Sequence, residues 1–208
     1  MQVFLRDLNS HMVNAWNKYF KDEPDVHVSY GDIFAPGPHM VAEAIVSPAN
    51  SFGFMDGGID YVYSMELGWE MSEFLRKMID VKHSGELLVG QAEVVDIHMK
   101  NPKAKFRYLI SAPTMRTPCN VARTANAYLA FRATLQKAEE YGINSVLCPG
   151  LGTMVGEMPF GVCALQMYEA WKTRGGNHKK YSVLAAAHMR NHMLMTPAAY
   201  DAALQAGQ

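Results

Sequence analysis

The segment from Ile45 to Asp60 constrains the fold most strongly, because it passes from an apolar strand through a glycine-rich loop into a helix. The strand pattern ends at Pro48, and the loop that follows includes the pair Gly57 and Gly58. Adjacent glycines indicate a turn with unusual dihedrals, or a place where another group approaches the backbone closely. A helix that begins near Ile59 would direct its unpaired N–H groups toward this loop, which favours a bound anion.

A second segment repeats this arrangement, with an apolar strand pattern at residues 145–148, a glycine-rich loop at 149–156 and a helix pattern after it. Strand patterns occur at residues 3–5, 25–30, 44–46, 92–97, 107–112 and 145–148, and helix patterns at 10–20, 59–80 with a break near Gly68, 120–141, 160–173 and 181–195. This order predicts a three-layer α/β/α sandwich with a mixed central sheet. Both glycine loops are expected at the C-terminal ends of adjacent buried strands, where such sheets bind ligands.

Some of these elements carry further signals. Asn120 is a candidate N-cap for the helix at 120–141, and Gly142 follows its end. The strands at 92–97 and 107–112 are expected to form a hairpin, and residues 36–38 a loop. The period of residues 181–195 fits a helix or a strand, and its run of alanines favours the helix.

Composition limits the possible functions. The 208 residues fit one domain, expected over 1–208, and 49% of them are hydrophobic, which is enough to build a core. The formal net charge of −1 gives no electrostatic reason to coat nucleic acid. Three cysteines without a CxxC spacing argue against a disulfide framework or a zinc site. The cysteines are expected to be reduced, which predicts a cytoplasmic protein, and we expect no metal or cofactor. No apolar run approaches the roughly 18 residues of a membrane span, so no membrane partner is expected.

Four motifs in a fixed order resemble those of the macro domain. They are Gly31-Asp32-Ile33, then Ile45 to Asn50, then Gly57-Gly58-Ile59-Asp60, then Pro149 to Thr153. The resemblance covers roughly residues 25–175, with a strand and a helix before this core and helical additions after it. An ordered set of motifs is far more specific than one glycine pattern. The resemblance implies a fold that binds ADP-ribose or a derivative.

The resemblance also implies roles for individual residues. Asp32, with Ile33 beside it, would meet the adenine, and Asn50 would meet the distal ribose. The first glycine loop would wrap that ribose and the diphosphate, and the second would cradle the phosphates; the implied contacts are Gly57, Gly58, Ile59, Gly150, Gly152, Thr153, Met154, Val155 and Gly156. Neither loop contains Lys or Arg, which fits a cradle of backbone amides. The GxxxxGK[ST] pattern of a P-loop is absent.

The chain departs from the family pattern at four positions. Ser47 and Pro48 stand in place of the usual Asn and Ala, which stiffens the strand end and removes one amide side chain. Met154 stands where glycine is usual, and Gly156 where an aromatic residue often covers the distal ribose. The lid over the ribose would then come from Phe52, Phe54 or Met154.

The hypothesis that the chain is a hydrolase depends on Asp60. In macro domains that remove mono-ADP-ribose from acidic side chains, a Gly-Val-Asp sequence places a carboxylate near the distal ribose, and Gly58-Ile59-Asp60 is similar. The resemblance implies that Asp60 orients a water for attack at the anomeric C1″ while Asn50 positions the ribose. No metal is needed for this route.

Plainer interpretations remain open for each residue. Asp60 can stabilise a helix start through the macrodipole, Asn50 can close its own turn, and Asp32 can be an exposed loop acid. Three functions therefore follow. The chain hydrolyses an ADP-ribosyl linkage (in a mono-ADP-ribosylated protein, ADP-ribose-1″-phosphate or O-acetyl-ADP-ribose), reads ADP-ribose without turnover, or is an α/β domain that has lost the ligand.

Overall fold

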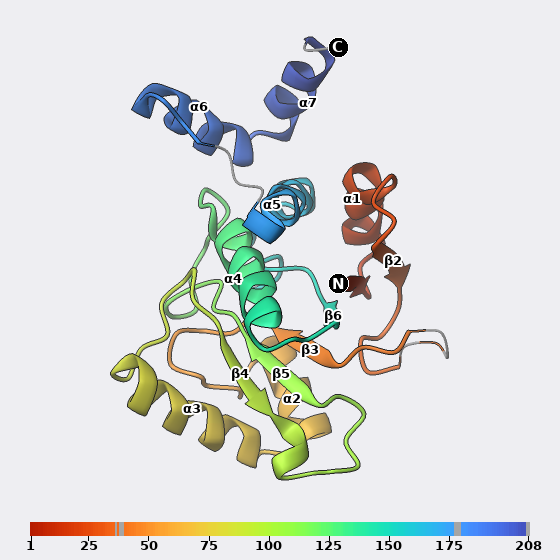
Figure 1. The fold of residues 1–208 in the computed structure, drawn as a ribbon, viewed down its shortest axis with the longest axis vertical. Helices are drawn as coiled ribbons and strands as arrows, with labels where there is room; N and C mark the ends of the chain where they lie inside the picture. Colours follow the sequence, from red (N-terminus) through yellow and green to blue (C-terminus); the bar gives the residue numbers. More distant parts are fainter. Residues whose placement is uncertain (36, 38–39, 177–179, 207–208) are drawn as a thin grey trace.

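A computed structural model describes residues 1–35, 37, 40–176 and 180–206, so only Gly37 of the loop expected at 36–38 lies among the described residues. Within these residues, six strands form one sheet in the order β2-β1-β6-β3-β5-β4 (Figure 1). Neighbouring strands run parallel except β4, which is antiparallel to β5. The strands are β1 (Gln2–Asp7), β2 (Val26–Tyr30), β3 (Ala44–Ser47), β4 (Glu93–Asp96), β5 (Tyr108–Ser111) and β6 (Ser145–Cys148).

Helices cover both faces of the sheet. One face carries α1 (Ser10–Phe20), α4 (Asn126–Glu140) and α5 (Phe160–Lys172), and the other carries α2 (Gly58–Leu67) and α3 (Glu70–His83). Two further helices, α6 (Leu184–Leu194) and α7 (Pro197–Ala206), lie beyond α5, away from the sheet (Figure 1). No helix in the described part of the chain has the length and apolar character needed to cross a membrane.

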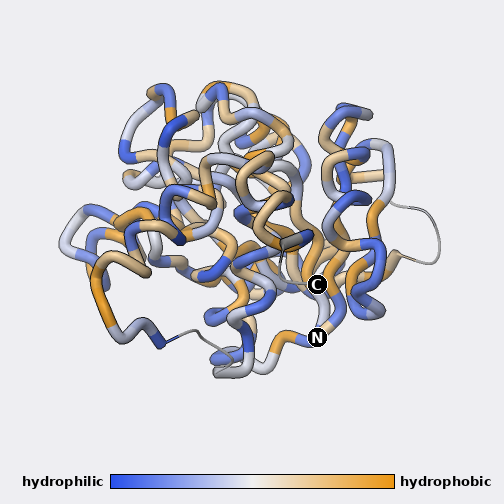
Figure 2. The backbone as a smooth tube through the Cα atoms, turned by 90° about the horizontal axis from the view of Figure 1, so that it is seen from above, coloured by the Kyte–Doolittle hydropathy of each residue, from blue (hydrophilic) through white to orange (hydrophobic). Residues whose placement is uncertain are grey.

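The central strands are apolar because both of their faces are covered. In β3, Ile45 packs in the cluster beneath α2 and α3, whereas Val46 packs in the cluster beneath α1, α4 and α5. The hydrophobic stretches accordingly gather toward the interior, and many hydrophilic stretches lie at the periphery (Figure 2). This arrangement confirms the three-layer sandwich with a mixed sheet.

The prediction for the helix at 120–141 is wrong at its start. The helix begins at Asn126, and Asn120 is not its N-cap. The Asn120 side chain instead accepts from the Ala122 N–H at 3.0 Å and donates to Glu157 at 2.7 Å. Asparagine readily bonds to the backbone two residues on, and the Val121 N–H also donates to the Gly156 carbonyl, so tertiary contacts override the apolar period.

The remaining element predictions hold. β4 and β5 form the expected hairpin, joined through a short 3-10 helix (Ile97–Met99), and the break near Gly68 separates α2 from α3. Residues 181–195 contain the helix α6, and Gly142 follows α4 with φ +65°. The final helix, α7, was not predicted. Its Pro197 occupies the first helical position, where the missing N–H of proline is not needed.

Candidate functional site

The two glycine loops lie at the same edge of the sheet. β3 and β6 are neighbouring parallel strands, with Ile45 paired to Leu147, so their C-terminal ends emerge side by side. A Cβ placed on Gly58 would lie 4.0 Å from Val155 Cγ2, which brings the start of α2 against the second loop. Gly58 has φ +58°, a left-handed conformation that side chains rarely adopt.

The second glycine loop folds tightly on itself. The Met158 N–H donates to the Gly152 carbonyl at 3.0 Å, and the Glu157 N–H donates to the Met154 carbonyl at 2.9 Å. A Cβ on Gly156 would lie 2.5 Å from the Gly152 carbonyl oxygen, so this turn excludes any side chain at position 156. The family's aromatic residue could therefore not stand there without reshaping the loop.

Both loops present runs of unpaired backbone amides. The N–H groups of residues 152–156 make no hydrogen bond to any other described residue. The same is true of the N–H groups of residues 55–60, which lead into the first turn of α2. Successive free amides and a helix N-terminus attract negative charge. The start of α2 lies beside the second loop at Gly58 and Val155, so the two runs of free amides are neighbours.

Asp32 lies just after β2 at the same edge of the sheet. Its side chain is exposed, and one carboxylate oxygen accepts from the Phe34 N–H at 2.9 Å in a local turn. Its backbone carbonyl accepts from Arg6 Nε at 2.7 Å. Ile33 is 6% exposed and packs in the core beneath α2 and α3, so only its backbone can contact a ligand.

The end of β1 connects these loops, a contact that sequence reasoning missed. The Asp7 carbonyl accepts from the Gly31 N–H at 2.9 Å, and its carboxylate accepts from the Gly150 N–H at 3.1 Å. Asp7 thereby links the loop that carries Asp32 to the second glycine loop. The signal available in the sequence was an acidic residue directly after the first strand pattern.

Asn50 closes its own turn. Its amide nitrogen donates to the Phe54 carbonyl at 2.7 Å, and its oxygen accepts from the N–H groups of Phe52 at 3.1 Å and Phe54 at 3.3 Å. The turn-closing role, one of the two interpretations of Asn50, is therefore the one seen in this structure. One hydrogen of the Asn50 amide remains available to another partner.

The Asn50→Ala variant should consequently be less stable than the wild type. Removing three side-chain hydrogen bonds from one turn is expected to lower the free energy of unfolding by about 1–3 kcal/mol. Urea unfolding followed by circular dichroism measures this change. Asn50→Asp keeps the oxygen that accepts two of these bonds and should lose less. Equal stability of Asn50→Ala and wild type would contradict this role.

Phe52 and Phe54 are held by arginines from other parts of the chain. The Arg76 guanidinium lies 4.4 Å from the Phe54 ring centre, and that of Arg116 lies 5.0 Å from the Phe52 ring centre. Met154 and Val155 are 76% and 54% exposed, so the second loop carries uncovered apolar side chains toward solvent. Of the three lid candidates, Met154 is therefore the one without a ring contact to hold it.

Asp60 is buried, which distinguishes it from an ordinary acid at a helix start. It lies in the first turn of α2, is 7% exposed, and accepts a hydrogen bond from Ser47 Oγ at 2.5 Å. Burial raises the pKa of Asp60 to about 6, although the Ser47 hydrogen bond acts in the opposite direction. The other carboxylate oxygen makes no hydrogen bond to a described residue, so it can accept one from a water.

Ser47 is the second contact that the sequence did not reveal. Strand alternation places Ser47 on the same sheet face as Ile45, beneath α2, and the loop then returns Asp60 to that face. The serine noted as a departure from the family pattern thus fixes one oxygen of the buried carboxylate.

Comparisons with known proteins agree with this architecture. The sequence pattern described as "Macro domain" matches residues 46–167. An uncharacterized protein from Aquifex aeolicus is 36% identical over 145 residues, covering 70% of this chain and 79% of that protein. An uncharacterized protein from Aeropyrum pernix is 30% identical over 159 residues, covering 76% and 77%.

Solved structures show the same fold. The macrodomain of Mycobacterium tuberculosis DarG superposes with a TM-score of 0.55 at 22% identity, covering 70% of this chain and 88% of that one. A mutant Oceanobacillus iheyensis macrodomain with ADPR gives a TM-score of 0.57 at 16% identity, covering 72% and 77%. At these identities the similarity establishes the fold alone.

Proposed function

The chain belongs to the macro domain family, and we propose that it binds ADP-ribose or a derivative between its two glycine loops and hydrolyses an ADP-ribosyl linkage there. The observation that supports this proposal is the pair of unpaired amide runs at residues 55–60 and 152–156, which are neighbours where the start of α2 lies beside Val155.

The diphosphate is the part of the ligand that these amides suit. It carries two negative charges, whereas the loops contain no Lys or Arg. Backbone N–H groups and the N-terminus of α2 can supply the positive potential instead. Backbone hydrogen bonds close the turn of the second loop, and the side chains of Asn50 and Ser64 hold the first loop before a ligand binds.

We assign the two ends of the ligand to the residues on either side of these amides. Asp32 lies on the far side of the Asp7 link, where its exposed carboxylate can accept from the adenine amino group. Ile33, Gly57, Ile59, Gly150, Gly152 and Thr153 would then contribute backbone contacts along the cleft. The distal ribose would lie near Asn50 and Asp60, at the opposite end.

Hydrolysis would proceed through one water molecule. Its oxygen attacks C1″ of the distal ribose, the bond from C1″ to the leaving oxygen breaks, and Asp60 accepts the proton that the water loses. When the leaving group is a protein carboxylate, it departs as the anion, and Asp60 returns its proton to solvent. General-base assistance of this kind is worth roughly 10²–10⁴-fold in rate. The pKa of Asp60, raised by burial to about 6, leaves it ionised at neutral pH and basic enough to assist.

A reader that binds ADP-ribose without turnover is the second candidate. Two observations favour it. The Asn50 side chain is already committed to its own turn, and Asp60 is 7% exposed. In that case Asp60 would serve only the start of α2 and the Ser47 contact.

Calorimetric titration of the full chain with ADP-ribose tests the binding step. We expect saturable heat with one site per chain and a rise in melting temperature, because a ligand that binds only the folded state stabilises it. Incubation with a protein that carries a Glu- or Asp-linked mono-ADP-ribose then separates hydrolase from reader. The absence of both heat and a thermal shift would contradict the two candidates together and favour a domain that has lost the ligand.

A further inference from the structure

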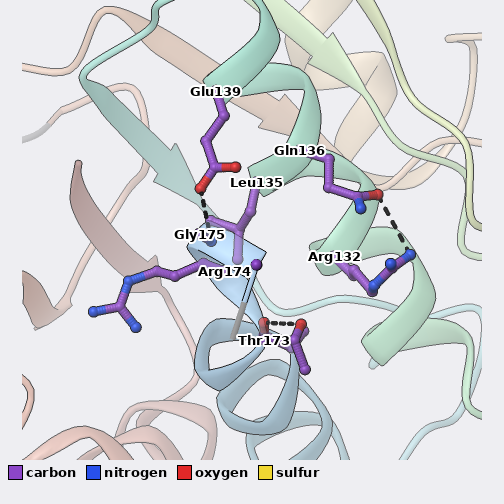
Figure 3. Close-up of a pocket in the computed structure, with 9 residues that line it drawn as sticks. Arg132, Leu135, Gln136, Glu139, Thr173, Arg174 and Gly175 are labelled. Atoms are coloured by element: carbon purple, nitrogen blue, oxygen red, sulfur yellow. Dashed lines mark hydrogen bonds between the residues drawn. The ribbon is translucent and has the colours of Figure 1, made fainter. Parts of the chain in front are cut away.

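A second hollow lies between α4, α5 and α6, apart from the glycine loops. Its volume is about 400 Å³, within the usual range for small-molecule sites, and it adjoins a smaller hollow of about 80 Å³. Arg132 and Thr173 line both hollows, and Figure 3 shows the smaller one with these two side chains. The side chains that matter here are Tyr128, Arg132, Lys172, Tyr181, Arg190 and Asn191.

This hollow is separate from the glycine loops described above. One wall is α6, which lies beyond residues 46–167 that match the family pattern. The residues it takes from α5 begin at Glu169, nine positions after the helix starts at Phe160, which corresponds to about 13 Å along the helix axis. The glycine loops contribute none of its lining residues.

The charges around the hollow favour an anion. Three cations face one carboxylate, that of Glu169, which is 5% exposed. Glu169 forms an ion pair with Arg190 and accepts from the Tyr200 hydroxyl at 2.5 Å, and Lys172 Nζ lies 3.9 Å away. These contacts compensate the buried carboxylate.

Arg132 is the cation that the protein leaves available. Among the described residues it forms no ion pair, and its one hydrogen bond, to the Gln136 side chain, is 3.4 Å long (Figure 3). A guanidinium in this situation is suited to a two-pronged contact with a phosphate group.

Two tyrosines give the hollow flat surfaces. Tyr128 comes from α4, and Tyr181 precedes α6 and is 46% exposed. Aromatic rings stack with nucleobases without regard to their sequence, and the amide of Asn191 can exchange hydrogen bonds with a base edge. We propose that this hollow is a second ligand site, which binds a mononucleotide with its phosphate on Arg132 and its base against the tyrosines.

Calorimetric titration of the full chain with uridine 5′-monophosphate tests this proposal, because uracil lacks the adenine amino group that Asp32 would accept from at the glycine loops. We expect one saturable site, at least tenfold weaker in Arg132→Gln and in Tyr181→Ala than in the wild type. Lys137→Gln is the matched control, because Lys137 lies on the same helix, pairs with Glu140 at 2.9 Å and does not line either hollow. It should bind as the wild type does.

Two further titrations show which site is occupied and which part of the nucleotide is bound. Binding should be unchanged in Gly156→Ala, which alters the second glycine loop, and uridine without phosphate should bind at least tenfold more weakly. The proposal is overturned by no binding in the wild type, or by binding that Gly156→Ala removes and Arg132→Gln does not. It is also overturned if inorganic phosphate binds as tightly as the nucleotide, since the tyrosines would then have no part.

Discussion

Asp60→Asn is expected to slow ADP-ribosyl hydrolysis by about 100-fold or more, while ADP-ribose binding stays largely intact. Asparagine keeps the shape of the side chain and can still accept from Ser47 Oγ, so the start of α2 should be preserved. It cannot take a proton from water. Release of ADP-ribose from a protein that carries a Glu- or Asp-linked mono-ADP-ribose measures the rate, and calorimetry measures the affinity.

The pH profile distinguishes a base from a structural acid. Hydrolysis should rise as the pH passes through about 6, because burial raises the pKa of Asp60 to about 6 and the base must be ionised. In Ser47→Ala this rise should move to higher pH, since the hydrogen bond that lowers the pKa is lost. Turnover by Asp60→Asn at the wild-type rate would refute the catalytic role and leave the reader.

The free energy of unfolding should fall as the pH rises through about 6, because Asp60 is then ionised in the buried site. A carboxyl whose pKa is 3.8 in the unfolded chain and about 6 in the folded one favours folding when protonated, below pH 4, and loses that contribution as the pH rises through 6. Asp60→Asn carries no charge to bury. It should therefore match the wild type near pH 4 and exceed it by about 2–3 kcal/mol at pH 8.

Gly156→Ala is expected to weaken ADP-ribose binding at least tenfold while the chain remains folded. The new Cβ would lie 2.5 Å from the Gly152 carbonyl oxygen and 2.6 Å from Val121 Cγ2, so the turn has to open. Opening it displaces the free amides of residues 152–156, which we propose bind the phosphates. Calorimetric titration with ADP-ribose measures the loss, and far-ultraviolet circular dichroism reports whether the fold is kept.

Gly161→Ala provides the matched control for this change. Gly161 lies in the first turn of α5, five residues further along the chain, and a Cβ there would come no closer than 3.9 Å to another side chain. Alanine also suits a helix better than glycine. This variant should bind ADP-ribose as the wild type does. Equal affinity in Gly156→Ala would mean that the second loop does not hold the phosphates.

The sequence was sufficient where the signal was local. The apolar runs of β3 and β6, each followed by a glycine loop and a helix, predict the layers of the sandwich and the edge where the loops meet. The alternatives for Asn50 and Asp60 could also be stated from residue type and position. The single domain expected over residues 1–208 and the residue roles remain predictions.

Contacts between distant segments could not be predicted. Asn120 has the residue type of an N-cap, yet its bonds to Ala122 and Glu157 hold a turn, and the helix begins later. Predicting the contact between Ser47 and Asp60 would require knowing that the loop returns to the sheet face beneath α2. Predicting the second hollow would require the position of α6 relative to α4 and α5, and sequence periodicity does not give the position of one helix relative to another.

The carboxylate and carbonyl of Asp7 have a consequence for the energetics of recognition. They hold the loops at Gly31 and Gly150 together, so the proposed ADP-ribose site would be shaped before a ligand binds. A preorganised site loses little conformational entropy on association, because the segments that meet the ligand are already restrained. Adenine and diphosphate would then bind to two loops that are already fixed relative to each other, instead of ordering each loop separately.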